Sequence, residues 1–255
     1  MSDTYIYKYI RLEYLLEWLR TKKMRLDPVY SWQDPYENFF LKQSFGFEGK
    51  EVSMTSIAKD IYGQSWTTKR ESDAMWRIYS HDVSAILGND NIALMKRSIR
   101  IRTTPQKLLR VVQEDLIPCQ QIIRKVSYRT KEEMIAWLKQ IETIKEEELR
   151  MYFIDSCFIK RDLFSYEDES RLIVEEPGSD VAESKKGAAF YSFNPDEMIE
   201  EYTIDPRLDK VCAYATQKIL ENNGIPASKL NQSMIYSLDL SNKIRITRKE
   251  NDLQA

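Results

Sequence analysis

Segments with strand patterns and segments with helical patterns are interspersed along this chain, without the regular strand–helix–strand alternation of parallel-sheet proteins. Tyr5–Tyr9 alternates aromatic with other residues, as a half-buried strand does. Leucines at helical spacing follow from Leu12 to Leu19. Ile61–Thr67 and Ile99–Thr103 are clear later strands. This irregular order predicts an α+β fold with a mostly antiparallel sheet and flanking helices.

The composition is that of a water-soluble globular protein. Its 255 residues suffice for one large core, so we expect a single domain over residues 1–255, with a polar C-terminal tail from about residue 247. No apolar run reaches the length of a membrane span, and the first residues do not form a signal segment, so no membrane association is expected. The three widely separated cysteines suit neither a zinc site nor a disulfide framework, which favours a cytoplasmic location.

Several kinds of site are excluded by what the chain lacks. His81 is the only histidine, which excludes metal centres built on several histidines. The chain has seven glycines and contains neither Gly-x-Gly-x-x-Gly nor a Gly-Lys-Ser/Thr loop. Any bound nucleotide is therefore expected to be held by side chains and strand backbone.

The most chemically suggestive segment is Phe164–Arg171, which runs directly into the apolar residues Leu172–Val174. If this segment is a strand, Glu167, Glu169 and Arg171 share one face. Two carboxylates about 7 Å apart resist joint ionisation, and an adjacent guanidinium offsets part of that cost. Such a group can stabilise a cationic transition state and take up a proton. A solvated strand face would show the same pattern.

A basic stretch lies in the middle of the chain. The net charge is −2, but residues 96–131 hold ten Lys or Arg against two Asp or Glu. Local asymmetry of this kind can guide a nucleic acid to one face, although a merely solvated surface has the same composition. The candidate nucleic-acid contacts are Arg100, Arg102, Lys107, Arg124 and Lys125.

The order of several short motifs resembles a bacterial family, the domain of unknown function numbered two-nine-seven-one. The match spans roughly residues 5 to 210, and its most specific part is Glu71–Ser80, which contains Trp76. The other matching motifs are Tyr7-Lys8-Tyr9, Asp34-Pro35-Tyr36-Glu37, Ser65-Trp66-Thr67, Phe158-Ile159-Lys160-Arg161 and Glu167-x-Glu169-x-Arg171. This resemblance does not name a function.

A second resemblance does name one. ADP-ribosyltransferases of the Arg–Ser–Glu type carry an aromatic-plus-basic pair on the first strand, Ser-x-Ser/Thr on a middle strand and Glu-x-Glu on a later one. This chain has Tyr7-Lys8, Ser65-Trp66-Thr67 and Glu167-x-Glu169 in the same order. The resemblance implies a split antiparallel sheet and an NAD-consuming transferase. Lys8 stands where those enzymes carry arginine, and lysine lacks the bidentate fork of a guanidinium.

The resemblance also assigns roles to residues. Glu169 would bind the ribose hydroxyl and stabilise the positive charge that develops as the nicotinamide–ribose bond breaks. Glu167 would orient or deprotonate the acceptor. The expected contacts with NAD are Lys8, Tyr9, Ser65, Trp66, Thr67 and Trp76. Strand packing of the hydroxyls and core burial of the tryptophans would explain several of these residues equally well.

The transferase hypothesis predicts NAD as a substrate and no metal. It implies a bacterial toxin or phage-defence effector, with a nucleic-acid base (RNA or DNA) or a protein side chain as acceptor and an antitoxin protein as partner. One alternative is a non-catalytic nucleotide- or nucleic-acid-binding module. A second is a metal-dependent nuclease built on Asp34, Glu37, Glu167 and Glu169, since carboxylates alone can hold Mg²⁺.

Overall fold

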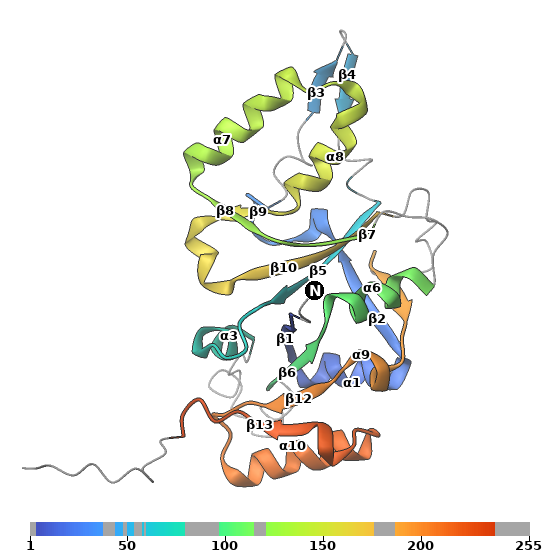
Figure 1. Ribbon diagram of the computed structural model, residues 1–255, viewed down its shortest axis with the longest axis vertical. Coiled ribbons are helices and arrows are strands. Elements are labelled where there is room, and N and C mark those ends of the chain that lie inside the picture. Colours follow the sequence, from blue (N-terminus) through green and yellow to red (C-terminus); the bar gives the residue numbers. More distant parts are fainter. Residues whose placement is uncertain are drawn as a thin grey trace, which may run out of the picture.

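The computed structural model describes residues 4–37, 44–47, 50–53, 58, 60–79, 97–114, 121–175 and 187–237, and the structural statements below refer to these residues. Its main element is a nine-stranded sheet in which every strand pair is antiparallel except β12 with β13 (Figure 1). The expected α+β fold with a mostly antiparallel sheet is confirmed. His81 and the tail from about residue 247 lie outside the described residues.

The elements follow one another without regular alternation. The strands of the large sheet are β1 (Ile6–Arg11), β2 (Lys23–Pro28), β5 (Ile61–Thr67), β6 (Ser98–Thr103), β7 (Gln121–Lys125), β10 (Glu169–Glu175), β11 (Ala189–Ser192), β12 (Glu201–Ile204) and β13 (Leu230–Gln232). Two small sheets pair β3 (Ser44–Phe47) with β4 (Lys50–Ser53), and β8 (Ser127–Arg129) with β9 (Ile159–Arg161). The α-helices are α1 (Leu12–Thr21), α3 (Asp73–Tyr79), α6 (Pro105–Glu114), α7 (Lys131–Lys139), α8 (Glu146–Ser156), α9 (Pro195–Met198) and α10 (Lys210–Asn222). Short 3₁₀ helices are η1 (Val29–Ser31), η3 (Gln140–Thr143), η4 (Asp162–Glu167) and η6 (Ala227–Lys229).

The sheet splits at β5, and the split positions the site. One edge of β5 pairs with β10 along its whole length, from Ile61 to Thr67. On the other edge, β2 pairs only at Tyr62 and Gly63, and β1 pairs only at Thr67. Strands β1 and β2 therefore diverge along this edge, and the backbone between Gly63 and Thr67 faces the gap between them. This geometry agrees with the split sheet that the transferase resemblance implies.

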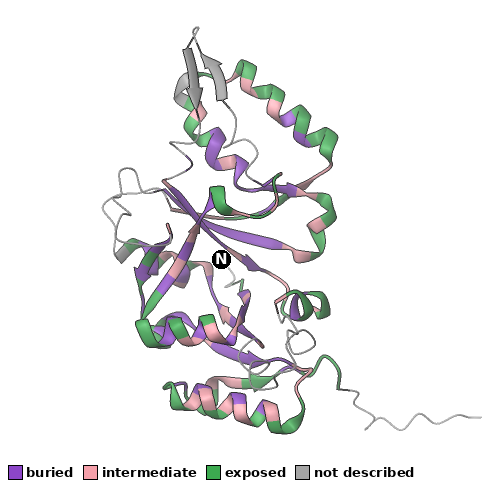
Figure 2. Cartoon of the chain, turned by 180° about the vertical axis from the view of Figure 1, so that it is seen from behind, coloured by how far each residue is buried: buried purple, intermediate pink, exposed green. Residues whose placement is uncertain are grey.

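Two hydrophobic cores lie on opposite faces of the inner strands, which are the most buried part of the molecule (Figure 2). The larger core gathers apolar side chains from α1, α6, α9 and α10, and the smaller core lies under α7 and α8. Strand β10 serves both cores because its side chains alternate between faces. Leu172 and Val174 enter the larger core and Ile173 the smaller one, so Glu169, Arg171 and Ile173 share a face.

Local capping signals in the sequence place several helix starts and ends correctly. The hydroxyl of Ser72 accepts a hydrogen bond from the third residue of α3, and Thr104 does the same ahead of α6. Thr130 forms a reciprocal capping box with Glu133 at the start of α7. Beyond α10, Gly224 adopts φ +89°, a left-handed conformation that glycine accepts without steric cost.

The expectation of one continuous strand over Phe164–Arg171 is wrong. Residues up to Glu167 form the 3₁₀ helix η4, and β10 begins at Glu169. Between them, Asp168 adopts φ +43° in the left-handed region, which aspartate tolerates better than most side chains. Glu167 and Glu169 therefore lie on different elements. Strand alternation does not determine how they face each other.

Candidate active site

A cleft opens where β1 and β2 diverge. Its larger part has a volume of about 660 Å³ and lies between β1, α1, β2 and β5, with Tyr79 at the end of α3 contributing to the wall. A second hollow of about 410 Å³ extends from it toward η4 and the start of β10. The two hollows share the side chains of Asp27, Trp32, Gln33, Ser65 and Tyr79. They form one continuous site with two compartments.

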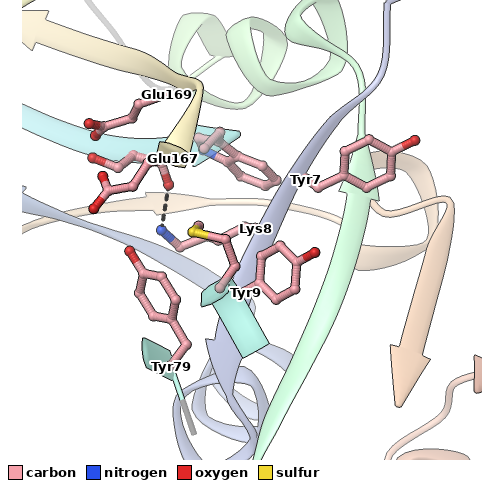
Figure 3. Close-up of a pocket in the computed structure, with 9 residues that line it drawn as sticks. Tyr7, Lys8, Tyr9, Tyr79, Glu167 and Glu169 are labelled. Atoms are coloured by element: carbon pink, nitrogen blue, oxygen red, sulfur yellow. Dashed lines mark hydrogen bonds between the residues drawn. The ribbon is translucent and has the colours of Figure 1, made fainter. Parts of the chain in front are cut away.

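Lys8 lines the larger compartment, next to Ser65, which the two compartments share. Strand β1 directs its side chain into the gap, where Nζ donates a hydrogen bond of 2.9 Å to the carbonyl oxygen of Ser65 (Figure 3). Burial lowers the pKa of Lys8 to about 8, and the negative charges of Asp27 and Glu169 oppose this only in part. A small pocket beside Lys8 is also lined by Ser65, Glu167 and Glu169. The structure thus brings together residues from β1, β5 and β10 that are distant in sequence.

Glu169 is the first residue of β10 and is 4% exposed. Its carboxylate receives two hydrogen bonds from Arg171, each 2.9 Å long, and lies 3.2 Å from the ammonium of Lys160. The nearby hydroxyl of Ser65 also favours the ionised form of this carboxylate. Burial alone would raise the pKa of Glu169, but these positive charges and hydrogen bonds outweigh it, so the pKa lies below its usual value. Glu169 is therefore held as a carboxylate.

Glu167 lies partly buried at the end of η4, and its pKa is shifted in the opposite direction. Its Oε2 atom accepts a hydrogen bond of 2.6 Å from Lys160. Burial raises the pKa of Glu167, and the bond from Lys160 offsets only part of that rise, to which Glu169 and Glu37 also contribute. Two neighbouring carboxylates whose proton affinities differ in this way are the usual arrangement for dividing acid–base from electrostatic roles.

Aromatic side chains form the walls of the cleft. The ring of Trp32 stacks over the guanidinium of Arg171, with 4.4 Å between the guanidinium carbon and the ring centre. Gly63 lies beneath this ring, and a Cβ atom there would come within 2.7 Å of Trp32 Cζ2. Tyr79 points its hydroxyl toward Lys8 and the two glutamates (Figure 3). Burial, followed by the charges of Glu167 and Glu169, raises the pKa of this hydroxyl, so Tyr79 stays neutral.

Three further residues of the predicted NAD-contact set line the cleft only partly or support it. Thr67 is buried and donates a hydrogen bond of 2.6 Å to the carbonyl oxygen of Glu167, which joins β5 to η4. Trp66 borders the small pocket but points into the larger core, where its Nε1 donates to Gln64. Tyr9 lines both the small pocket and the larger compartment, although it is 2% exposed. Thr67 and Trp66 are neighbours on β5, so their side chains point to opposite faces of the sheet.

The predicted NAD contact at Trp76 does not agree with the structure. Trp76 is fully buried and packs edge-to-face against Tyr9, with 4.8 Å between the ring centres. Met75 completes this small core, and the Trp76 ring lines none of the compartments described above. Core burial, the simpler explanation for a tryptophan, is correct here.

The basic stretch divides into two groups, which corrects one nucleic-acid prediction. Arg100 is 1% exposed and bonded to Glu71, Glu201 and Thr203, so it cannot be a surface contact. Arg102 and Lys107 are partly buried and pair with Glu200 and Glu201. The other two residues, Arg124 and Lys125, lie exposed on β7, where they pair with Asp155 and Asp168.

The carboxylates proposed for a magnesium site face cations of the protein instead. Asp34 pairs with Arg161, while Glu37, Glu167 and Glu169 pair with Lys160, Arg171 or both. Within the described ranges, no group of three or more His, Cys, Asp or Glu is arranged to hold a metal ion. Ammonium and guanidinium groups occupy the positions where the nuclease hypothesis needs a cation.

Sequence reasoning assigned no role to several residues of the site. Trp32, Gln64 and Tyr79 come from a turn, a strand interior and a helix end, and only the folded chain brings them together. Lys160 and Arg161 belong to the motif Phe158-Ile159-Lys160-Arg161, and this motif is the only feature of the sequence that points to them as site residues. The sequence predicts that the guanidinium of Arg171 offsets the charge of a neighbouring glutamate, and the ion pair between Arg171 and Glu169 confirms this prediction.

No protein-family model and no curated protein sequence matches the chain, so membership of the bacterial family named above stays a prediction. Among solved structures, those of DarT from Thermus sp. 2.9 are similar to this chain. The complex with NAD⁺ has 12% identity and a TM-score of 0.39, over 91% of this chain and 96% of that chain. The complex with ADP-ribosylated ssDNA has 10% identity and a TM-score of 0.40, over 91% and 95%.

None of the described helices has the length and apolar character needed to cross a bilayer.

Proposed function

We propose that this chain is an NAD-dependent ADP-ribosyltransferase. The observation that carries the proposal is the convergence of Lys8, Ser65 and Glu169 on one cleft at the split of the sheet. These residues come from three strands, and their order in the chain is that of the transferase motifs. Glu169 is also held in its ionised form, as the stabilisation of a developing positive charge requires.

The larger compartment suits a dinucleotide in size and chemistry. Its volume of about 660 Å³ falls within the range of roughly 300 to 1,000 Å³ typical of small-molecule sites. Positive charges for a pyrophosphate come from Lys8, Arg11 and Arg25, and the aromatic rings of Trp32 and Tyr79 offer faces for a nicotinamide or adenine ring. These contacts use side chains and strand edges in place of a glycine-rich loop.

In the proposed reaction, the bond between nicotinamide and ribose C1′ breaks, and C1′ forms a new bond to a nucleophilic atom of the acceptor. The products are nicotinamide, the ADP-ribosylated acceptor and one proton. Glu169 would stabilise the positive charge that develops on the ribose. Glu167, whose pKa is raised, would accept the proton that the acceptor loses. Arg171 would hold Glu169 in place.

For the acceptor we propose a nucleic-acid base or a protein side chain, reached through the second compartment. Exposed Arg124 and Lys125 on β7, which pairs with β10, favour a nucleic acid approaching from this side. A toxin or phage-defence role, controlled by an antitoxin protein, would follow from such an activity.

A second candidate function, a non-catalytic nucleotide-binding module, is favoured by one observation. Arg171 and Lys160 together engage both oxygens of Glu169, which leaves fewer lone pairs for a ribose hydroxyl. In a binding module, this carboxylate would serve only to hold Arg171. Substitution of Glu169 would then alter stability without altering nucleotide binding.

Transfer of labelled ADP-ribose distinguishes the two functions. The protein is incubated with NAD labelled in its adenine ring and with bacterial lysate, which is then separated into DNA, RNA and protein. The transferase proposal expects label in one fraction with the wild type and loss of that label with Glu169→Gln. Glu175→Gln is the matched control, because Glu175 is a buried, ion-paired glutamate of the same strand outside the cleft. Absence of label with the wild-type protein would count against the proposal.

A further inference from the structure

The ammonium of Lys160 lies among three carboxylates beside the second compartment. Its Nζ atom is 2.6 Å from Glu167 Oε2, 2.9 Å from Glu37 Oε1 and 3.2 Å from Glu169 Oε2. A lysine ammonium has three N–H donors and no acceptor, so each donor can serve one carboxylate. The side chain is 10% exposed, and water and salt screen these interactions only weakly.

The two glutamates of the site depend on Lys160 to different degrees. Glu169 has a second cation, because the guanidinium of Arg171 binds both of its oxygens. Among the described residues, Lys160 is the one basic group that forms an ion pair with Glu167. Loss of the ammonium would therefore leave Glu169 paired but would leave Glu167 as a partly buried carboxylate without a counter-charge.

Backbone pairing and an aromatic contact determine where this ammonium lies. Lys160 is the middle residue of β9, and it pairs with Tyr128 in the parallel ladder with β8. The hydroxyl of Tyr128 accepts a hydrogen bond of 2.8 Å from the backbone N–H of Glu169. The ring of Phe164 lies 4.9 Å from Lys160 Nζ. The β8–β9 ladder thus connects the lysine to the start of β10, where Glu169 lies.

We propose that Lys160 is a positioning residue that holds Glu167 in its ionised form beside Glu169, so that Glu167 can take the proton of the acceptor. The inference rests on the proposed transferase function and adds a residue to it. The other charged or titratable groups that face this pair are Glu37, Arg171, Tyr79, Tyr128, Tyr166 and Lys8. Of these, only Arg171 and Lys8 are basic, and both act on Glu169.

The first test is the pH dependence of nicotinamide release. An opposite charge at this range lowers a carboxyl pKa by about 1 to 3 units, so Lys160→Met should raise the pKa of Glu167 by that amount. The acidic limb of the kcat/KM profile would move to higher pH by the same amount. Lys160→Arg, which keeps the charge, should leave the limb close to its wild-type position. A lysine with a packing role alone would lower the rate at every pH and leave the limb unmoved, which would overturn the proposal.

The second test needs neither NAD nor activity. With ¹³C-labelled glutamate, the side-chain carboxyl carbon of Glu167 is assigned by comparison with Glu167→Gln and titrated by NMR in the wild type, Lys160→Met and Lys160→Arg. The titration midpoint should rise in Lys160→Met alone. Lys218→Met is the matched control, since Lys218 pairs with Glu221 on α10 far from the cleft in the fold. If Lys160→Met does not fold, Lys160→Gln offers N–H donors without the charge and should show the same rise.

An unchanged Glu167 midpoint in the neutral variants would overturn the role of Lys160, whatever the wild-type activity. A wild-type protein that releases no nicotinamide would refute the transferase proposal, and the NMR titration would still decide whether Lys160 controls the charge of Glu167. The two failures are therefore distinguishable.

Discussion

The ammonium of Lys8 on β1 donates a hydrogen bond of 2.9 Å to the carbonyl oxygen of Ser65 on β5, inside the gap where β1 and β2 separate. This bond satisfies a strand carbonyl that has lost its neighbouring strand, and it points a positive charge into the cleft. The split of the sheet and the charge of the site are thus two consequences of one arrangement.

This arrangement makes NAD affinity sensitive to pH. Because burial lowers the pKa of Lys8 to about 8, the side chain is charged below that pH and becomes neutral as the pH rises through it. We expect the affinity for the anionic pyrophosphate to fall above about pH 8, approaching tenfold per pH unit for one lost proton. Calorimetric titrations between about pH 7 and 9.5 measure this. The Lys8→Arg variant stays charged, so its NAD affinity should not fall over this pH range. If the affinity of both proteins falls in the same way with pH, Lys8 is not the group whose titration weakens binding.

Arg171 should be a major determinant of stability. Its guanidinium is buried and binds Glu169, Glu37 and the carbonyl oxygen of Cys157. Arg171→Leu leaves carboxylates buried with one cation fewer, and we expect it to lower the free energy of unfolding by about 3 to 5 kcal/mol. Urea denaturation measures this. Arg77→Leu removes a largely exposed pair with Asp73 and should cost no more than about 1 kcal/mol. If the two variants lose the same free energy of unfolding, Arg171 does not stabilise the protein through buried ion pairs.

Gly63 is expected to be needed for the position of Trp32. A Cβ atom at residue 63 would lie 2.7 Å from Trp32 Cζ2 and 2.9 Å from Ile173 Cδ1, so Gly63→Ala should cost about 1 to 3 kcal/mol through overpacking. In a Trp32→Ala background, Gly63→Ala should cost less, because the ring that its Cβ atom would contact is absent. A double-mutant cycle by thermal or urea unfolding gives the coupling between the two positions. Additive effects would show that the ring does not rest on Gly63.

How far the sequence predicts this site depends on the range of each interaction. The hydroxyls of Ser72, Thr104 and Thr130 each accept a hydrogen bond from the backbone N–H three residues ahead, so the sequence alone marks these helix starts. The shared face of Glu169 and Arg171 follows from strand alternation and is also correct. Helix caps and strand alternation depend on residues close together in the chain, so they can be predicted from one sequence.

The errors come from local breaks and long-range contacts. Asp168 in a left-handed conformation ends η4 and places Glu167 on a different element from Glu169, and an Asp at that position does not reveal this conformation in advance. The basic stretch around Arg100 predicts a surface cation. Arg100 is buried because it pairs with Glu201, which is 101 residues away in the chain and cannot be identified as its partner from the local sequence. Trp76 resembled a cofactor contact because its motif was distinctive, whereas the structure uses it as core.

A toxin role gives a cellular prediction. Expression of the wild-type chain in bacteria should slow growth as NAD is consumed or the acceptor is modified, and Glu169→Gln should relieve this effect at equal protein levels. Glu175→Gln should remain as harmful as the wild type, because Glu175 pairs with Arg150 outside the cleft. Growth curves measure the effect on growth, and quantitative blotting checks that the variants are present at equal levels. Equal toxicity of Glu169→Gln and the wild type would favour the binding-module alternative.

The most direct measurement is the rate at which the purified protein releases nicotinamide from NAD in the presence of total DNA, RNA and cell protein. The transferase account predicts measurable release by the wild type and by Glu175→Gln. It predicts a rate lower by about 10²- to 10³-fold for Glu169→Gln, because one preorganised electrostatic contact to the transition state is lost. No release by the wild type with any of these acceptors, or equal rates for Glu169→Gln and the wild type, would contradict it.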